Sequence, residues 1–342
     1  MRENIVISGK ICYNKTYERA AECLLCRHSR EMLMKKITIK AYAKVNLTLE
    51  IVGEAGGYHL LDSCVASVDM YDQIVLKTRK DKLSAVTMKG MGSESIPPES
   101  NNALKAAEAF SKAFDVNGVD ITVYKNIPMG AGLGGSSADV AGVLNGMAAL
   151  YGVTDREKLG WIADGLGSDT KYMLNGGFAR MQGRGERLTS LDIDAKLYML
   201  LLCPDTSVSS GACYKAYDQM PKPQTRAEDS ATEHFIASLR KKDVKEAGRC
   251  LMNDLYLPAA SLNTDVKKAY EESLAFAPLG AVMTGSGSCV LSLFETKELC
   301  EWAKSRYKGK FRAYTVSTLI PDNKKKKGLK NPFILSEDEQ NL

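Results

Sequence analysis

The sequence predicts a protein that combines helices and strands. Runs of β-branched residues with partial apolar alternation indicate strands, and apolar residues repeated every three or four positions indicate helices. A glycine-rich segment at residues 127–139 joins one such strand to one such helix. The 342 residues suffice for about two domains, and a content of 44% hydrophobic and 25% charged residues is typical of a globular protein.

The strand signals are spread along the whole chain. The first covers residues 37–52 and is rich in β-branched side chains. The longest apolar run, residues 197–203, is too short to cross a bilayer, so we expect no membrane partner. The last strand signal contains a glycine-rich turn. In chain order, the expected strands lie at residues 37–52, 65–76, 119–124, 178–187, 196–203 and 281–294.

Helical patterns lie between these strands in no strict alternation. Leu104, Ala107 and Phe110 fall on one side of the first expected helix. Residues 154–157, Thr-Asp-Arg-Glu, are typical of a capping box that opens a helix. Residues 221–230 are polar with two prolines and predict a surface loop. The expected helices lie at residues 102–114, 136–151, 155–165, 231–252 and 264–276.

Charge and cysteine usage limit the classes of protein. The net charge is +5, and the run Lys324 to Lys327 alone contributes four of the positive charges. The remainder is near neutral, so we expect no nucleic-acid partner. The nine cysteines are an odd number, and no signal peptide is apparent. Both features favour the reducing cytoplasm.

Both ends of the chain differ in composition from the middle. Residues 1–33 are rich in Cys and Arg and show no clear period. We interpret them as an N-terminal extension that activity does not require, with a natural start at Met32 or Met34. Residues 321–342 are charged and rich in amides, which predicts a disordered tail.

The glycine-rich segment is the main functional signal. It holds four glycines within six residues, Gly130 to Gly135, and the hydroxyls of Ser136 and Ser137 follow at once. Glycine allows a backbone to approach a ligand without a Cβ in the way. The start of a helix adds unpaired N–H groups and partial positive charge. The segment therefore predicts a cradle for an anion, most often phosphate.

Two common phosphate-binding motifs do not fit this segment. A Walker loop needs a lysine after its last glycine, and Ser136 stands there. A dinucleotide fingerprint needs an acidic residue about 20 positions on, at the end of a second strand. Asp155 lies at that distance but belongs to the predicted capping box, and no β-branched run precedes it.

A third motif, Pro-x-x-x-Gly-Leu-Gly-x-Ser-Ser, resembles the phosphate loop of the GHMP kinases. Further local matches extend the resemblance over residues 36–320. Within the family, the Gly-Tyr-His element resembles members that phosphorylate a cytidine-diphosphate-linked sugar alcohol of the non-mevalonate isoprenoid pathway. The other matching segments are residues 43–47 (Ala-Lys-Val-Asn-Leu), 57–61 (Gly-Tyr-His-Leu-Leu), 69–72, 253–255 and 285–288.

The resemblance implies a fold that the strand and helix patterns alone do not specify. GHMP kinases have an α+β architecture with two lobes, and their sites lie in the cleft between them. We therefore expect a ribosomal protein S5 domain 2-like N-terminal lobe at residues 34–192, which binds ATP. A ferredoxin-like C-terminal lobe at residues 193–320 would bind the substrate. The oligomeric state is expected to be a monomer or a homodimer.

On the nucleotide side, the resemblance implies ATP as a substrate together with Mg²⁺. The glycine-rich segment would wrap the triphosphate, and Ser136 or Ser137 would reach Mg²⁺ or a phosphate oxygen. Asn102 and Lys125 match family positions that contact the adenosine portion. The expected ATP-binding residues are Asn102, Lys125, Pro128, Gly130, Ala131, Gly132, Leu133, Gly134, Gly135, Ser136 and Ser137.

On the chemical side, phosphoryl transfer needs a group that orients the proton of the acceptor hydroxyl. Asp169 resembles the catalytic aspartate of the family and would act as general base. Lys44 resembles its partner lysine, which would stabilise the carboxylate and steer the hydroxyl or the γ-phosphate. The resemblance thus implies a catalytic pair that lies 125 residues apart in the sequence (169 − 44).

The acceptor side of the predicted site contains aromatic residues. Aromatic faces stack on nucleobases, and an imidazole can hydrogen-bond a base edge. By resemblance, Tyr58 and Tyr214 would sandwich cytosine and His59 would bind its edge. The expected substrate-binding residues are Asn46, Tyr58, His59, Tyr214, Gly285 and Ser286.

Other functions remain compatible with these residues. The chain could be a GHMP kinase for a different small alcohol, such as a sugar, homoserine or a mevalonate-type compound. A non-catalytic nucleotide-binding protein would not need both Lys44 and Asp169, so their presence disfavours that reading. A dinucleotide-dependent oxidoreductase is disfavoured because no strand signal precedes Asp155.

Overall fold

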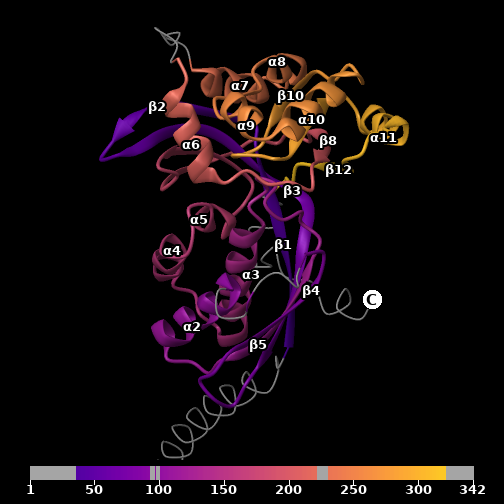
Figure 1. The fold of residues 1–342 in the computed structure, drawn as a ribbon. Helices are drawn as coiled ribbons and strands as arrows, with labels where there is room; N and C mark the ends of the chain where they lie inside the picture. Colours follow the sequence, from indigo (N-terminus) through magenta and orange to yellow (C-terminus); the bar gives the residue numbers. More distant parts are fainter. Residues whose placement is uncertain (1–35, 93–96, 98–100, 222–229, 321–342) are drawn as a thin grey trace, which may run out of the picture.

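The computed structural model describes residues 36–92, 97, 101–221 and 230–320 (Figure 1). The expectations for the extension at residues 1–33 and the tail at residues 321–342 lie outside this part of the chain. Most of the loop expected at residues 221–230 also lies outside it. No helix among the described residues is long and apolar enough to cross a membrane.

The larger sheet is organised around one long strand. Strand β3 (Tyr58–Thr78) pairs antiparallel with β1 (Lys36–Asn46), β2 (Thr48–Ala55), β5 (Val119–Lys125) and β6 (Phe178–Gly183). Alternating burial along β5 shows the period of two expected for a half-buried strand. The sheet is completed by β4 (Ala85–Gly90), β7 (Arg187–Leu191) and the short β9 (Met252–Asn253).

Four helices accompany this sheet in the part of the chain that the structure describes. Helices α2 (Asn102–Phe114) and α3 (Gly135–Tyr151) lie beside the strands, and α4 (Arg156–Asp164) and α5 (Thr170–Met173) follow (Figure 1). Helix α4 begins where the capping box was expected, although the cap is Asp155, which accepts from Lys158 N at 3.0 Å. Helix α3 is buried over much of its length because it packs on β1 and β3.

The smaller sheet is antiparallel throughout. Its order is β10 (Gly280–Met283), β11 (Val290–Phe294), β8 (Tyr198–Cys203) and β12 (Arg312–Ser317). The apolar run at residues 197–203 forms β8, an inner strand whose two faces are both buried, which explains why it carries no polar alternation. The helices of this half are α6 (Ser210–Gln219), α7 (Ala231–Arg240), α8 (Val244–Arg249), α9 (Tyr256–Leu262), α10 (Thr264–Leu274) and α11 (Lys297–Arg306).

The two sheets and their helices confirm the expected α+β, two-lobed fold. Residue 192 lies between β7 of the larger sheet and β8 of the smaller one. The chain nevertheless crosses back, because β9 pairs in parallel with β2. The lobe boundaries given above stay predictions.

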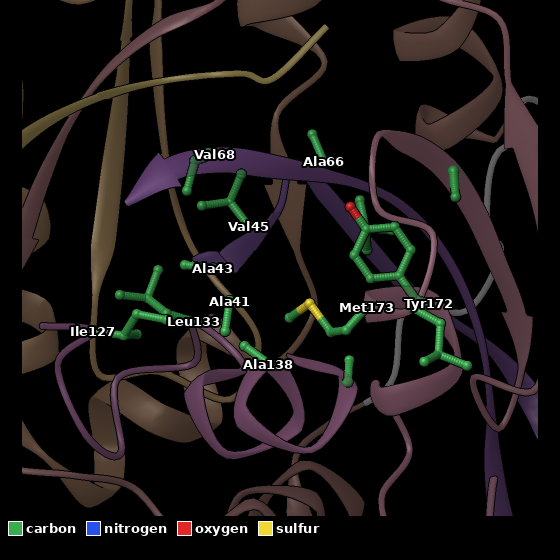
Figure 2. Close-up of a cluster of buried hydrophobic side chains, with 14 of the residues drawn as sticks. Ala41, Ala43, Val45, Ala66, Val68, Ile127, Leu133, Ala138, Tyr172 and Met173 are labelled. Carbon is green, nitrogen blue, oxygen red and sulfur yellow. The ribbon is translucent and has the colours of Figure 1, made fainter. Parts of the chain in front are cut away.

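A buried apolar cluster joins the glycine-rich loop to the sheet. Figure 2 shows Ile127 and Leu133 of the loop facing Ala41 and Ala43 of β1, with Met173 of α5 beside them. All five side chains are at least 95% buried. At about 25 cal/mol per Å² of apolar surface removed from water, such burial helps to hold the loop on β1.

The single strand expected at residues 37–52 is wrong, because a bend at Leu47 divides it into β1 and β2. The backbone N–H of Asn46 donates to Thr284 Oγ1 at 2.9 Å, and Leu47 N donates to Cys64 O at 2.8 Å. These bonds turn the chain at a corner between the lobes. The apolar pattern continues through the corner because Leu47 is itself buried.

The helix expected at residues 231–252 is also divided. Lys242 adopts a left-handed conformation with φ +59°, which ends α7. Asp243 then caps α8, and its carboxylate accepts from Glu246 N at 2.9 Å. The residues that follow form β9. The strand expected at residues 178–187 ends at Gly183, and a separate strand, β7, begins at Arg187. Elements that the sequence patterns did not predict are β4, β7, β9, α5, α6, α9, α11 and β12.

A carboxylate on β2 anchors the first turn of α7. Glu50 accepts from Ser230 Oγ at 2.7 Å, Thr232 N at 2.9 Å and Ala231 N at 3.3 Å. Burial alone would raise the pKa of Glu50, but these hydrogen bonds outweigh burial and lower the pKa below 4.5. The charged form of Glu50 therefore ties α7 to the larger sheet.

We predict that Glu50→Gln lowers the free energy of unfolding by about 1–3 kcal/mol at neutral pH, because charge-assisted cap bonds are lost. The contribution of Glu50 is present above pH 4.5 and is lost as the pH falls through its lowered pKa. Urea denaturation at pH 7 and at pH 3 measures it. If the free energies of unfolding of wild type and variant differed by the same amount at both pH values, this assignment would be contradicted.

Candidate active site

The glycine-rich loop connects β5 to α3 with its helix N-terminus open. Gly130, Gly132 and Gly134 have φ between +63° and +75°, a region that other residues rarely adopt. Gly134 occupies the N-cap position of α3, and no side-chain hydrogen bond caps the helix there. The first N–H groups of this 17-residue helix are therefore left for a ligand.

Glycine is required at Gly132 because the second lobe approaches it. A Cβ on Gly132 would lie 2.1 Å from Thr284 O. Thr284 Oγ1 in turn donates to Gly132 O at 3.3 Å, and Cys289 N donates to Ala131 O at 3.2 Å. The loop is thus held by the segment just after β10, in addition to its own lobe.

A buried cation fixes the two ends of the loop. Lys125, the last residue of β5, donates to Asp72 of β3 and to Asp139 of α3, the latter at 2.7 Å. Asp72 also accepts from the backbone N–H groups of Asn126 and Ile127 at 2.6 and 2.9 Å. Burial opposes the charge on Lys125, but the two carboxylates outweigh it and raise its pKa.

The side chain of Lys125 is thereby committed within the protein. Burial raises the pKa of the Asp139 carboxyl, and one of its oxygens has no hydrogen-bond partner among the described residues. Lys125 lines the pocket where ATP was expected, but its ammonium faces the carboxylates of Asp72 and Asp139. Its predicted contact with adenosine stays a prediction.

A pocket of about 340 Å³ lies over the loop. Every residue that the sequence predicted to bind ATP lines it. Asn102 donates to Ser136 Oγ at 3.0 Å, which links the start of α2 to the start of α3. The predicted residues in this wall are Asn102, Lys125, Pro128, Gly130, Ala131, Gly132, Leu133, Gly134, Gly135, Ser136 and Ser137.

A second pocket, of about 600 Å³, lies on the other side of the loop. It contains all the residues predicted for catalysis and for the acceptor. Gly132, Gly134 and Ser137 line both pockets, so the two cavities meet at the loop. The predicted residues in this second pocket are Lys44, Asn46, Tyr58, His59, Asp169, Tyr214, Gly285 and Ser286.

Lys44 and Asp169 face each other beside the place where the pockets meet. Lys44 Nζ lies 3.4 Å from Asp169 Oδ2, and the two side chains are 6% and 27% exposed. Lys44 Nζ also donates to Asn46 Oδ1 at 2.5 Å. Because strand side chains alternate, Lys44 and Asn46 share one face of β1, while Ala43 and Val45 point into the core.

Local structure leaves the Asp169 carboxylate available to the pocket. Asp169 is the N-cap of the short helix α5, but its side chain makes no cap hydrogen bond. The following residues Tyr172 and Met173 are buried and hold α5 against the core (Figure 2). A carboxylate beside a buried ammonium can accept a proton from an alcohol that enters the larger pocket.

Three aromatic residues, Tyr58, His59 and Tyr214, line the larger pocket, and Tyr217 packs beside them. The imidazole of His59 stacks on Tyr214 with ring centres 4.9 Å apart, and the edge of Tyr217 approaches it at 5.7 Å. Tyr58 is 58% exposed, with the Arg184 guanidinium 4.9 Å above its ring. The predicted sandwich of a base between Tyr58 and Tyr214 stays a prediction, because His59 itself covers Tyr214.

Sequence reasoning missed several residues of the larger pocket. Arg184 lies in the turn between β6 and β7, flanked by Gly183 and Gly185 with positive φ. Those two glycines are a sequence signal of a tight turn that could have drawn attention to it. Lys215 and Asp218 lie on α6, a helix that the sequence patterns did not predict.

Two domain models of the GHMP kinases match this chain. The model of the GHMP kinases N terminal domain matches residues 101–178, which include the glycine-rich loop and Asp169. The model of the GHMP kinases C terminal domain matches residues 235–310, which include Thr284 and Gly285. The two matches thus cover both sides of the contact between the loop and the second lobe.

Curated relatives agree along most of the chain. A protein of Clostridium tetani named 4-diphosphocytidyl-2-C-methyl-D-erythritol kinase is 33% identical over 286 residues, 82% of this chain and 99% of its own length. A protein of the same name from Symbiobacterium thermophilum is 34% identical over 292 residues, again 82% of this chain and 99% of its own length.

Solved structures show the same fold. A crystal structure of 4-(cytidine 5'-diphospho)-2C-methyl-D-erythritol kinase superposes with a TM-score of 0.68 at 28% identity, and the match covers 82% of this chain and 98% of that one. Homoserine kinase from Cytophaga hutchinsonii, at 16% identity, superposes with a TM-score of 0.63 over 84% of this chain and 95% of its own. The chain belongs to the GHMP kinase family.

Proposed function

We propose that this protein transfers the γ-phosphoryl group of ATP to the 2-hydroxyl of 4-diphosphocytidyl-2-C-methyl-D-erythritol, a step of the non-mevalonate isoprenoid pathway. The observation that carries the proposal is the Lys44–Asp169 pair at the junction of two pockets. One pocket contains an open helix N-terminus suited to phosphate. The other contains the aromatic cluster of Tyr58, His59 and Tyr214.

The relatives favour this acceptor over the alternatives. The curated proteins at 33–34% identity share one substrate name. The similarities to homoserine kinase and mevalonate kinases lie at 16% identity or below, and they indicate the fold alone. A kinase for a different small alcohol is therefore the second reading, without a specific observation in its favour.

In the proposed reaction, the loop and the start of α3 bind the ATP phosphates through backbone N–H groups. Asp169 accepts the proton of the acceptor hydroxyl as the oxygen attacks the γ-phosphorus, while the bond from that phosphorus to the β-phosphate oxygen breaks and ADP leaves. Lys44 pairs with the Asp169 carboxylate, and its ammonium offsets negative charge that develops on the transferred group. Asn46 orients Lys44 through the 2.5 Å hydrogen bond.

Oxygen ligands suited to Mg²⁺ occur where the pockets meet. Mg²⁺ is a hard cation that prefers carboxylate and hydroxyl oxygens. Ser137 lines both pockets, Asp169 lies in the larger one, and Ser136 lies at the start of α3. We propose that Ser136 or Ser137 helps to hold Mg²⁺ together with ATP. When bound, the ion would neutralise charge on the phosphate oxygens.

The function is tested directly with purified protein, ATP and Mg²⁺. Release of ADP is followed in the presence of the cytidine-linked alcohol, homoserine, mevalonate or a simple sugar. We expect turnover with the cytidine-linked alcohol alone. Turnover of another alcohol, without turnover of the cytidine-linked one, would replace the proposed substrate by that alcohol.

For the loop, we predict that Gly132→Ala raises KM for ATP at least tenfold, because its Cβ would collide with Thr284 O. Gly152→Ala is the matched control. Gly152 has φ +67°, but a Cβ there meets nothing within 4 Å. Both variants incur about 1–2 kcal/mol of backbone strain, and only the first displaces the loop. Equal KM values for ATP in the two variants would show that the collision is unimportant.

For the catalytic pair, we predict that Asp169→Asn lowers kcat by about 10²- to 10⁴-fold, the usual contribution of a general base. The dissociation constant of ATP, measured by calorimetry, should change less than about threefold. The variant keeps the contacts that bind ATP in the ground state and loses only the group that accepts the proton. Asp164→Asn is the control, because the exposed carboxylate of Asp164, at the end of α4, pairs with Lys171 of α5 and lines neither pocket. Turnover near the wild-type rate in Asp169→Asn would mean that another group accepts the proton.

A further inference from the structure

The turn between β6 and β7 brings a cation to the larger pocket. Arg184, in this turn, lines the pocket, and its guanidinium carbon Cζ lies 4.9 Å from the centre of the exposed Tyr58 ring. Gly183 and Gly185, on either side of Arg184, have φ of +70° and +106°, which lets the chain reverse within a few residues. The positive charge is thus carried by a tight turn at the wall of the pocket.

Glu186 fixes the shape of this turn. Its Oε2 accepts from Arg184 N at 2.6 Å, and a Cβ on Gly183 would collide with the same carboxylate. Backbone hydrogen bonds lower the pKa of Glu186, so the carboxylate is charged at neutral pH. Glu186 is therefore bound to the backbone of the turn, and no carboxylate of the described residues forms an ion pair with the Arg184 guanidinium.

The turn adjoins both ends of the proposed reaction site. The Arg184 guanidinium contacts Tyr58, which belongs to the aromatic cluster. A Cβ on the next residue, Gly185, would lie 3.8 Å from Ser168 O. Ser168 directly precedes Asp169, the proposed general base. A ligand that reaches from the aromatic cluster to Asp169 therefore passes this turn.

A second cation lines the pocket from α6. Ser210, the first residue of this helix, has its Oγ 2.8 Å from Ser286 Oγ, in the segment that follows β10. Further along the helix, Tyr214 stacks on His59. Lys215 follows Tyr214 and lines the larger pocket, without an ion-pair partner in the part of the chain that the structure describes.

The charges of the pocket indicate what it can bind. Its other charged side chains have partners within it, namely Lys44 with Asp169 and His59 with Asp218. Arg184 and Lys215 remain as two cations that no described carboxylate neutralises. A diphosphate that joins two alcohols carries one negative charge on each phosphate, and a guanidinium binds phosphate oxygens through two parallel N–H groups. The pocket is therefore complementary in charge to such a diphosphate.

We propose that Arg184 is a specificity-determining residue that binds the diphosphate of the acceptor, with Lys215 as the second cation. The inference rests on the proposed function, because this diphosphate joins the cytidine to the alcohol of the same acceptor. Arg184 can keep its contact with Tyr58, since a ring meets the face of a guanidinium and a phosphate meets its N–H edge. A single phosphate in the linkage would neutralise only one of the two cations.

The binding of cytidine, cytidine monophosphate and cytidine diphosphate tests this proposal without turnover. A non-hydrolysable ATP analogue first saturates the nucleotide pocket, so that the probes enter the larger pocket. We expect wild type to bind the diphosphate at least about tenfold more tightly than the monophosphate. Arg184→Gln should weaken diphosphate binding by about 10- to 100-fold and leave cytidine binding unchanged. Arg184→Lys should show an intermediate loss, because it keeps the charge and loses the planar fork.

Arg187→Gln is the matched control, since Arg187 is an exposed arginine of β7 that lines neither pocket. It should bind all three probes as wild type does. If Arg184 served only to support Tyr58, Arg184→Gln would weaken cytidine, the monophosphate and the diphosphate by the same factor, and the inference would be overturned. An unchanged preference for the diphosphate in the Arg184→Gln/Lys215→Gln double variant would also overturn it.

Steady-state kinetics with the cytidine-diphosphate-linked alcohol separate binding from chemistry. In Arg184→Gln we expect KM for this acceptor to rise about 10- to 100-fold and kcat to change less than about threefold, because the diphosphate takes no part in the bond changes. KM for ATP should stay the same. A loss confined to kcat would contradict the inference. Wild-type protein that prefers cytidine diphosphate to the monophosphate but does not phosphorylate the alcohol would support the diphosphate site and remove only the proposed function.

Discussion

The ammonium of Lys125, buried between Asp72 and Asp139, is the constraint on which the rest of the site depends. Removing a charged group from water costs several kcal/mol, and only close partners offset that cost. Lys125 ends the strand before the glycine-rich loop, and Asp139 lies in the helix after it. The loop cannot move away from β3 without separating these charges. Both pockets share residues of that loop, so the cluster also fixes where they meet.

Much of the site could be predicted because its signals are local in the sequence. The glycines of the loop need positive φ, and the serines after them mark a helix start, so both residue types identify the loop directly. The helix at residues 102–114 and the strand at residues 119–124 were predicted almost to the residue, since their periodicity reflects one buried face. Lys44, Asp169 and His59 were found by resemblance to a family, because no local pattern separates them from ordinary surface residues.

What the sequence could not predict depends on contacts between distant segments. The corner at Leu47 exists because Asn46 bonds to Thr284, 238 residues away, while the apolar pattern runs on unbroken. The Asp218 contact with His59 spans 159 residues. Helix α6 itself gave no signal, because Cys213 is its only buried residue and an apolar stripe is therefore missing. Propensity and periodicity describe one element at a time, whereas these features are set by which elements pack together.

Strand β3 has a further consequence for the choice of substrate. A single 21-residue strand carries His59 near its start and Asp72, the anchor of the loop, near its end. Hydrogen bonds to four neighbouring strands hold it in place. The separation between the proposed base-binding end of the site and the proposed phosphoryl-transfer end is therefore set by one continuous backbone. Strand β3 thus fixes the distance between these two ends. An alcohol linked to the right base by a chain of the wrong length would leave its hydroxyl out of reach of Asp169.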